Sequence, residues 1–238
     1  MSVRPRRRIF SRVLLLLLLS LVVVAAFWFG LVPQRLSPFP PISLDERPSW
    51  FVDPRLAALR RDPVLCRAVV RSPHAEATPL ADNPLKGGCG WVNAVRLSTA
   101  GGARVGAEPL TCEMAAAFAL WMTHEVQPTA LAMLGSKVAS VRDMGSYSCR
   151  NIIGNPLWKD ARSQHATANA FDVGGFTLEN GRSISVRRDW QGRDVEARFL
   201  REIHARSCRY FRVSLGPDFN PAHRDHFHFD RGYLWSCR

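Results

Sequence analysis

The amino-acid sequence predicts an α+β domain, a small and mostly antiparallel sheet with helices packed on it, preceded by an N-terminal transmembrane helix. Three observations carry this prediction: a long apolar run near the N-terminus, two segments with helical periodicity, and several short strand-like runs separated by turn residues. Helices mixed with short antiparallel strands are typical of the α+β class. The last 175 residues or so, 64–238, are enough for one domain with a sizeable core.

The N-terminus has the pattern of a membrane anchor. Residues 1–12 carry five arginines and no acid, and residues 13–32 form an apolar run broken only by Ser20 and Gly30. About 20 residues at 1.5 Å each cross a bilayer as a helix. The arginines predict a cytoplasmic tail, with the rest of the chain in the periplasm or another extracytoplasmic space. A cleaved signal peptide is the alternative, but it favours a shorter apolar region and small residues where 27–29 are bulky.

The segment after the anchor is rich in proline. Residues 33–63 contain seven prolines. Because proline fixes φ and removes a backbone donor, we expect an extended linker that lifts the domain off the membrane.

The six cysteines support export. They are even in number and scattered, without a closely spaced pair of the kind that a zinc ribbon needs. Three disulfides formed in an oxidising compartment explain them better. Six cysteines allow about 15 connectivities. Pairing neighbours in the sequence gives our expectation: Cys66–Cys89, Cys112–Cys149 and Cys208–Cys237.

Two helices and five strands are predicted inside the domain. Thr111 is placed to cap a helix that runs through Met122 and is limited by Pro128, and Asp194 is placed to cap a second helix with apolar residues at steps of four. The strand-like runs are 137–142, 169–178, 183–188, 211–215 and 226–230, with turns expected at Gly174-Gly175 and Asn180-Gly181.

The positive charge is spread widely. Net charge is +12, of which the N-terminal tail supplies five, and the rest forms no stripe with interleaved aromatic residues. Nucleic acid is therefore not expected as a partner. An anionic cell-wall polymer or a membrane surface fits the charge, and so does a solvated surface with no specific partner.

Four of the seven histidines lie in two segments that also carry carboxylates, 163–172 and 223–228. Imidazole nitrogen and carboxylate oxygen are zinc ligands, and a catalytic zinc keeps three protein ligands and an open position. Strand alternation places His226, His228 and Asp230 on one face and directs Phe227 and Phe229 into a core. The three histidines outside these segments, at 74, 124 and 204, are expected to be structural or exposed.

Segment 163–172 resembles the S-x-H-x-x-G-x-A-x-D signature of the zinc D-alanyl-D-alanine peptidases, a group that includes murein endopeptidases and the zinc-binding hedgehog domain. Four positions agree and the glycine is replaced by Ala168: the agreeing residues are Ser163, His165, Ala170 and Asp172. Segment 223–228 resembles the second motif of that group, in which an acid stands three residues before the last ligand. From Cys66 to Cys237 the chain is similar to the bacterial extensin-like C-terminal family, at 88–90, 147–150, 174–176 and 215–217.

This resemblance implies a hedgehog/DD-peptidase-like fold and a ligand set. Carried over residue by residue, it suggests His165, Asp172 and His228 as ligands of Zn²⁺ and Asp225 as general base. Zinc lowers the pKa of water toward 7, and a neighbouring carboxylate then removes the proton. Strict alternation would put Asp225 on the face opposite His228, so it serves as base only if the strand starts after it.

Four further residues receive roles from the resemblance. Arg150 matches an arginine upstream of the first ligand and is expected to hold the oxyanion, with a surface ion pair as the alternative. His226 and His223 resemble accessory histidines that hold or protonate substrate, or else orient a ligand. Ser163 is expected to position substrate or a ligand by hydrogen bonding.

The function expected from these features is zinc-dependent hydrolysis of D-amino-acid-containing peptide bonds of peptidoglycan outside the cytoplasm. The alternative is a module that retains zinc but only binds cell wall or a partner protein, since fold alone does not establish activity. The acid at position 225 favours the enzyme, because a pure binding site needs no base. A disulfide-stapled domain without metal would leave the His/Asp clustering unexplained.

Overall fold

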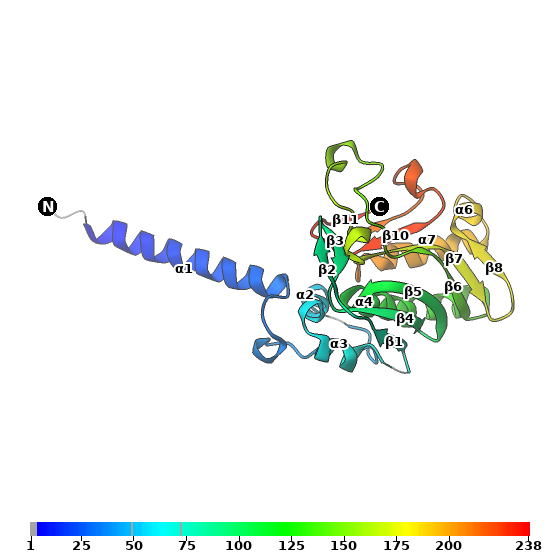
Figure 1. The fold of residues 1–238 in the computed structure, drawn as a ribbon, viewed down its shortest axis with the longest axis horizontal. Coiled ribbons are helices and arrows are strands. Elements are labelled where there is room, and N and C mark those ends of the chain that lie inside the picture. The colour runs from blue at the N-terminus through cyan, green and yellow to red at the C-terminus, as the bar shows by residue number, and fades with distance from the viewer. Residues whose placement is uncertain (1–3, 49, 72) are drawn as a thin grey trace.

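The computed structural model describes residues 4–48, 50–71 and 73–238. In this part of the chain one long N-terminal helix projects from a folded α+β body (Figure 1). Its helices are α1 Arg4–Trp28, α2 Val52–Ala57, α3 Pro63–Val69, α4 Cys112–Trp121, α5 Gln127–Leu134, α6 Val186–Asp189 and α7 Val195–Ser207. Its strands are β1 Ala75–Pro79, β2 Asn83–Lys86, β3 Cys89–Trp91, β4 Ala94–Ala100, β5 Ala103–Thr111, β6 Val138–Gly145, β7 Ala170–Leu178, β8 Ser183–Ser185, β9 Val213–Leu215, β10 Phe227–Asp230 and β11 Ser236–Cys237.

The sheet is mixed but mostly antiparallel. Among the described residues, nine strands pair in the order β1-β4-β5-β6-β7-β10-β9-β11, with β8 added to β7, and β2 and β3 form a separate hairpin. Two pairs are parallel, β5 with β6 and β9 with β11. This confirms the predicted α+β class, and the sheet is larger than expected because the predictions missed β1, β4, β5 and β11.

Helices α4 and α7 cover one face of the sheet and form the core with it. Phe118 of α4 packs edge-on against Phe171 of β7, with ring centroids 4.9 Å apart. Trp121 contacts Phe229 of β10 at 4.9 Å and donates its indole N–H to the carbonyl of Ile203 in α7. All of these aromatic rings are fully buried. The opposite face of β7 and β10 is left for polar side chains.

The two predicted caps are confirmed, but Pro128 does not end the first helix. The Thr111 hydroxyl accepts from the N–H of Met114, and Asp194 accepts from the N–H of Ala197. The chain continues from α4 through a π-helical turn, Met122–Val126, into α5. Pro128 lies in the first turn of α5, where its missing N–H costs little because the π turn has already changed the hydrogen-bond register.

Two strand predictions need correction. Gly174-Gly175 is not a turn but lies within β7. A Cβ on Gly175 would come within 2.2 Å of the Ile184 carbonyl oxygen of β8, so the glycine permits close strand contact. The run 183–188 is a strand only to Ser185, after which α6 begins. The Asn180-Gly181 turn is found as predicted.

Segment 33–63 is not an extended spacer. Ile42, Leu44, Leu56 and Leu59 enter the core, whereas Trp50 and Phe51 stay exposed, and α2 packs on the body. The Asp53 carboxylate accepts hydrogen bonds from Arg212 and Arg231, both buried. Arg47 forms a bidentate pair with the buried Glu125. The prolines thus shape a packed segment, and apolar and charged residues between them dock it.

Three disulfides join the cysteines, and no described cysteine is free. The pairs are Cys66–Cys112, Cys89–Cys149 and Cys208–Cys237. Only the last was predicted correctly. The other two disulfides interleave along the sequence instead of joining neighbouring cysteines. Cys66 lies beside the start of α4, and Cys89, in the β2–β3 hairpin, lies beside the segment that follows β6.

Helix α1 begins earlier than the predicted anchor. Its apolar span is Ile9–Trp28 rather than 13–32, and the helix includes most of the predicted basic tail. Its length and composition fit one membrane crossing or a signal sequence. Residues 1–3 of the tail lie outside the described residues.

Candidate metal centre

Two neighbouring strands bring the His/Asp segments together. Strands β7 and β10 pair antiparallel, with His228 directly opposite Asp172. Residues opposite each other in such a pair project from the same face of the sheet. Both side chains therefore project from the face that points away from α4 and α7. Phe227 and Phe229 project into the core, as alternation predicted, and each is fully buried. The apolar packing therefore fixes the face on which the polar pair lies.

The third residue comes from the turn before β7. Residues Gln164–Thr167 form one turn of 3-10 helix, and the Ser163 hydroxyl accepts from the N–H of His165. Ala168 ends the turn with φ +54°, the left-handed conformation that favours glycine. This turn is tight enough to bring His165 back to Asp172.

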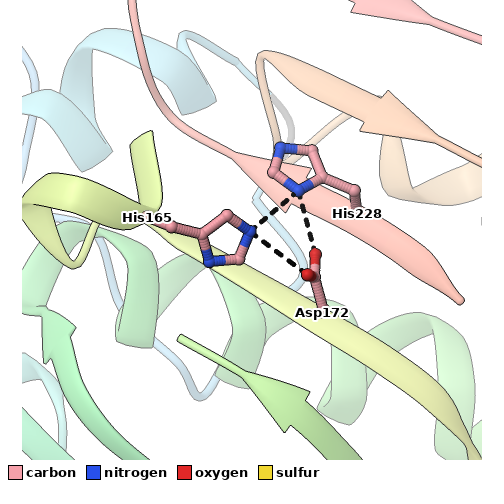
Figure 2. A group of neighbouring side chains, drawn as sticks. All are labelled: His165, Asp172 and His228. Carbon is pink, nitrogen blue, oxygen red and sulfur yellow. Dashed lines mark hydrogen bonds and ion pairs between the residues drawn. The ribbon is translucent and has the colours of Figure 1, made fainter. Parts of the chain in front are cut away.

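The three side chains converge on one point (Figure 2). His165 Nε2 lies 3.2 Å from Asp172 Oδ2, and His228 Nδ1 lies 2.9 Å from Asp172 Oδ1. The two imidazole nitrogens are 3.2 Å apart. Exposed fractions are 2% for His165, 8% for Asp172 and 9% for His228, so bulk water does not separate these groups.

The outer nitrogens determine which nitrogen of each ring offers a lone pair when the ring is neutral. His165 Nδ1 is 3.3 Å from the Ser146 carbonyl oxygen, and His228 Nε2 is 3.1 Å from Asp230 Oδ2. A carbonyl and a carboxylate only accept, so each of these outer nitrogens carries the proton of its neutral ring. Both inner nitrogens then aim lone pairs at a carboxylate. Such an arrangement repels itself unless a cation lies between, and it is the pattern in which ligand histidines are oriented by outer acceptors.

When no cation lies between the three groups, the imidazoles instead donate protons to Asp172. Burial raises the pKa of Asp172, but hydrogen bonds from His165 and His228 outweigh it and hold that pKa well below its usual range. Burial lowers the pKa of His228, while Asp172 and Asp230 together raise it to about 9. A proton on His228 thus takes the cation's place in the metal-free chain. Two imidazoles and one carboxylate are a donor set that fits zinc with one position open.

Asp225 and His226 lie at the edge of the cluster. Strand β10 starts at Phe227, after Asp225, which meets the condition set by the sequence. Asp225 Oδ1 is 2.9 Å from His226 Nδ1, and His226 Nε2 is 3.7 Å from Asp172 Oδ2. The hydrogen bond with His226 lowers the pKa of Asp225. Asp225 therefore acts on His226, and His226 is the member of the pair that faces the cluster.

His223 and Arg150 flank the same face. The His223 ring lies 5.6 Å from that of His228 and 5.3 Å from that of His226. Its Nδ1 is 2.7 Å from Asn220 Oδ1. Burial, then the neighbouring histidines, lower its pKa to about 4, and the charge of Arg150 acts in the same direction. Arg150 is therefore near His223 but outside the three-residue cluster. The backbone carbonyl of Arg150 accepts from the N–H of Ser163, which connects it to the turn that carries His165.

Sequence reasoning gave no role to Asp230 and missed Ser146. Asp230 was placed on the His228 face by alternation, and this placement is the signal for its contact with His228. Ser146 acts through its backbone carbonyl, so its side chain gave no signal. The remaining histidines lie elsewhere: His204 is buried beside Ser214, His124 contacts the Leu44 carbonyl, and His74 pairs with Asp45.

A separate pocket of about 530 Å³ shares the 164–169 segment with the cluster but is not lined by any of the three cluster residues. Trp91, Leu85 and Tyr233 give it apolar walls, and Arg60 and Arg61 give it positive charge.

The comparison with protein families decides the family. The model of the extensin-like protein C-terminus matches residues 64–238. The chain belongs to this extensin-like family. No curated protein and no solved structure matches it. The matched region of this extensin-like chain holds all three cluster residues and the Asp225–His226 pair.

Proposed function

We propose that this extensin-like protein is a membrane-anchored, zinc-dependent peptidase that hydrolyses D-amino-acid-containing peptide bonds of peptidoglycan outside the cytoplasm. The observation that carries the proposal is the convergence of two imidazole lone pairs and one carboxylate, each imidazole oriented by an outer acceptor. The resemblance of segment 163–172 to the zinc D-alanyl-D-alanine peptidases supplies the substrate class.

In this proposal His165, Asp172 and His228 hold the zinc. When bound, zinc polarises a carbonyl and lowers the pKa of water. Asp230 would keep the proton of His228 on Nε2, and Ser146 that of His165 on Nδ1, so that both ligand nitrogens are free of protons when zinc is bound. Ser163 holds the turn that carries His165, which favours the ligand-positioning role over direct substrate contact.

The Asp225–His226 pair is the proton acceptor of the reaction. The Asp225 carboxylate fixes the His226 proton on Nδ1 and leaves Nε2 free toward the cluster. A proton taken up at Nε2 gives an imidazolium that the adjacent carboxylate stabilises, and the pair can then return this proton to the leaving amine. Asp225 thus acts through His226 in addition to the direct role expected from the sequence.

His223 and Arg150 are placed for binding the substrate. At neutral pH the depressed pKa of His223 keeps its ring neutral, with Nδ1–H donated to Asn220 and Nε2 open. Arg150 supplies a positive charge beside it, suited to a substrate carboxylate or a developing oxyanion. Three disulfides and the apolar helix α1 are consistent with export and anchoring in the cytoplasmic membrane.

The test uses the full chain in detergent, stripped of metal, reloaded with zinc and incubated with purified peptidoglycan. We expect one zinc per chain and released peptide products detected by mass spectrometry. Asp225→Asn should keep the zinc and lose cleavage, whereas His165→Ala should lose both. Asp45→Asn, a change of the same type at an exposed carboxylate, should change neither.

Two results would overturn the proposal. Stoichiometric zinc with no cleavage of any wall substrate by the wild type would indicate the binding module. A chain that stays metal-free when offered zinc would exclude both the peptidase and the zinc-containing module.

A further inference from the structure

Exposed apolar side chains gather where α1 joins the body. We call this set the collar; its members, with exposed fractions, are Leu31 51%, Leu36 68%, Trp50 74%, Phe51 45%, Tyr233 72%, Leu234 46% and Trp235 54%. Soluble proteins rarely expose large contiguous apolar patches, and such patches mark interaction sites.

Contacts between aromatic rings show that separate segments of the collar meet at the end of α1. Phe39 lies 5.4 Å from Phe27 of α1 and 4.4 Å from Phe51. On another side, Phe29 lies 6.4 Å from Tyr233. The collar therefore combines residues just after α1, residues just before α2, and the C-terminal loop.

A buried arginine connects the C-terminal part of the collar to the same point. The Arg212 guanidinium lies 5.6 Å from the ring of Phe29 and 5.5 Å from that of Trp235. Arg212 is itself fixed by its ion pair with Asp53 of α2. Trp235 is thus held next to the residue that follows the apolar helix.

The junction between α1 and the body is tight. Gly30 has φ +67°, and a Cβ at this position would lie 2.2 Å from the Ala57 carbonyl oxygen of α2. The N–H of Leu31 donates to the carbonyl of Ala26 at 2.8 Å, which closes the helix end. No free linker separates the apolar span from the body. The position of the collar along the α1 axis is therefore fixed relative to Trp28, the last residue of the span.

This position coincides with a membrane boundary if α1 crosses a bilayer. The span Ile9–Trp28 has 20 residues. At about 1.5 Å per residue its length is close to the hydrocarbon thickness, roughly 30 Å. The residues that surround its end then lie among the lipid headgroups, where tryptophan and tyrosine are enriched because their rings are apolar with one polar end.

We propose that the collar lies in the headgroup–acyl boundary of the bilayer that α1 spans, so that the body is seated on the membrane in one orientation. The occupant of this surface is the lipid itself. The inference rests on the anchoring part of the proposed function and is independent of peptidase activity.

The test is fluorescence quenching by lipids brominated on the acyl chain near the headgroup, with the full chain in nanodiscs. Trp50→Phe and Trp235→Phe should each reduce the part of the tryptophan emission that the brominated lipids quench. Trp28, at the end of the apolar span, accounts for the quenched emission that remains. The control is Trp190→Phe. Trp190 directly follows α6, which lies on the side of the body opposite α1 (Figure 1). Its removal should leave the quenched emission unchanged.

The proposal is overturned if Trp50→Phe and Trp235→Phe leave the quenched emission unchanged, as Trp190→Phe does. Unchanged emission with two chains per nanodisc would assign the collar to a second copy instead. A mature chain that lacks α1 by mass spectrometry would also overturn it, even if that chain cleaves peptidoglycan. Conversely, quenched Trp50 and Trp235 in a chain without peptidase activity would retain the collar and reject only the catalytic proposal.

Discussion

Asp230 provides a sharp test of the metal centre because it never touches the converging atoms. Its Oδ2 faces His228 Nε2 at 3.1 Å, and its Oδ1 accepts the N–H of Gly232 at 2.8 Å. Asp230→Asn keeps the shape of the side chain, but its amide has only one oxygen to accept hydrogen bonds. The two donors at this position, His228 Nε2–H and Gly232 N–H, then face one oxygen and one NH₂ group. If the amide oxygen stays with Gly232, the NH₂ faces His228 Nε2 and favours the tautomer with the proton on Nδ1. That proton occupies the lone pair that the metal needs.

The expected size of this effect follows from outer acceptors in other zinc sites. Their loss costs about 10–100-fold in metal affinity. At about 1.4 kcal/mol per factor of ten, this is about 1.4–2.8 kcal/mol of binding free energy. The variant should keep all three ligands and still bind zinc, more weakly.

The assay is competition for zinc with a chromophoric chelator, wild type against Asp230→Asn. Asp194→Asn is the matched control, since Asp194 caps α7 and asparagine caps as well as aspartate. Its zinc affinity should equal that of the wild type. An Asp230→Asn chain that folds and binds zinc within about twofold of the wild type would refute the tautomer argument.

Three further predictions concern the fold. Asp53→Ala should lower the free energy of unfolding by about 3–5 kcal/mol in urea, because it leaves the buried Arg212 without its carboxylate and takes from Arg231 one of its two carboxylate partners. Asp45→Ala, at an exposed carboxylate, should change it by less than about 1 kcal/mol. Replacing both Cys66 and Cys112 by alanine should cost about 4 kcal/mol from the loss of a cross-link across 46 residues, and non-reducing peptide mapping should recover that pair. Burial lowers the pKa of His204 from 6.5 to about 4, so the unfolded chain takes up the proton first as pH falls. The contribution of neutral His204 to the free energy of unfolding is complete above pH 6.5 and is lost as pH falls toward 4, by about 3 kcal/mol in all. In His204→Gln the free energy of unfolding should therefore fall by about 3 kcal/mol less between pH 6.5 and 4 than in the wild type. An unchanged pH dependence would contradict this prediction.

Local signals in the sequence were sufficient to predict helix starts and the two faces of β10, because each depends on the residue type at a single position or on simple alternation. Thr111 and Asp194 cap helices, and the alternation of β10 separates phenylalanines from histidines. Strand β5 was missed although its burial alternates, because its inward residues include Ala103 and Ala107, which give little hydrophobic contrast. Bulges between β4 and β5 further shift the period that a strand pattern needs.

Composition misled the reading of segment 33–63. Prolines there predicted an extended spacer, yet Ile42, Leu44 and Leu56 are almost fully buried, and Asp53 enters a buried ion-pair network. Proline restricts φ but does not prevent packing of the residues between. The carboxylate partner of Arg47, Glu125, and the arginine partner of Asp53, Arg212, lie more than 70 residues away in the sequence, so no local pattern contains them.

The assembly of the candidate metal centre depends on which strands become neighbours, and this is the step that the sequence alone does not determine. Alternation predicts that Asp172 and His228 each face away from a core, but not that β7 lies beside β10. Once they pair, the apolar residues on either side set the register: Val173 opposes Phe227 and Phe171 opposes Phe229, all fully buried. A slip by one residue would turn His228 into the core and expose both phenylalanines. The hydrophobic core thus holds the carboxylate opposite the imidazole, and the candidate metal ligands come together as a consequence of packing that none of them takes part in.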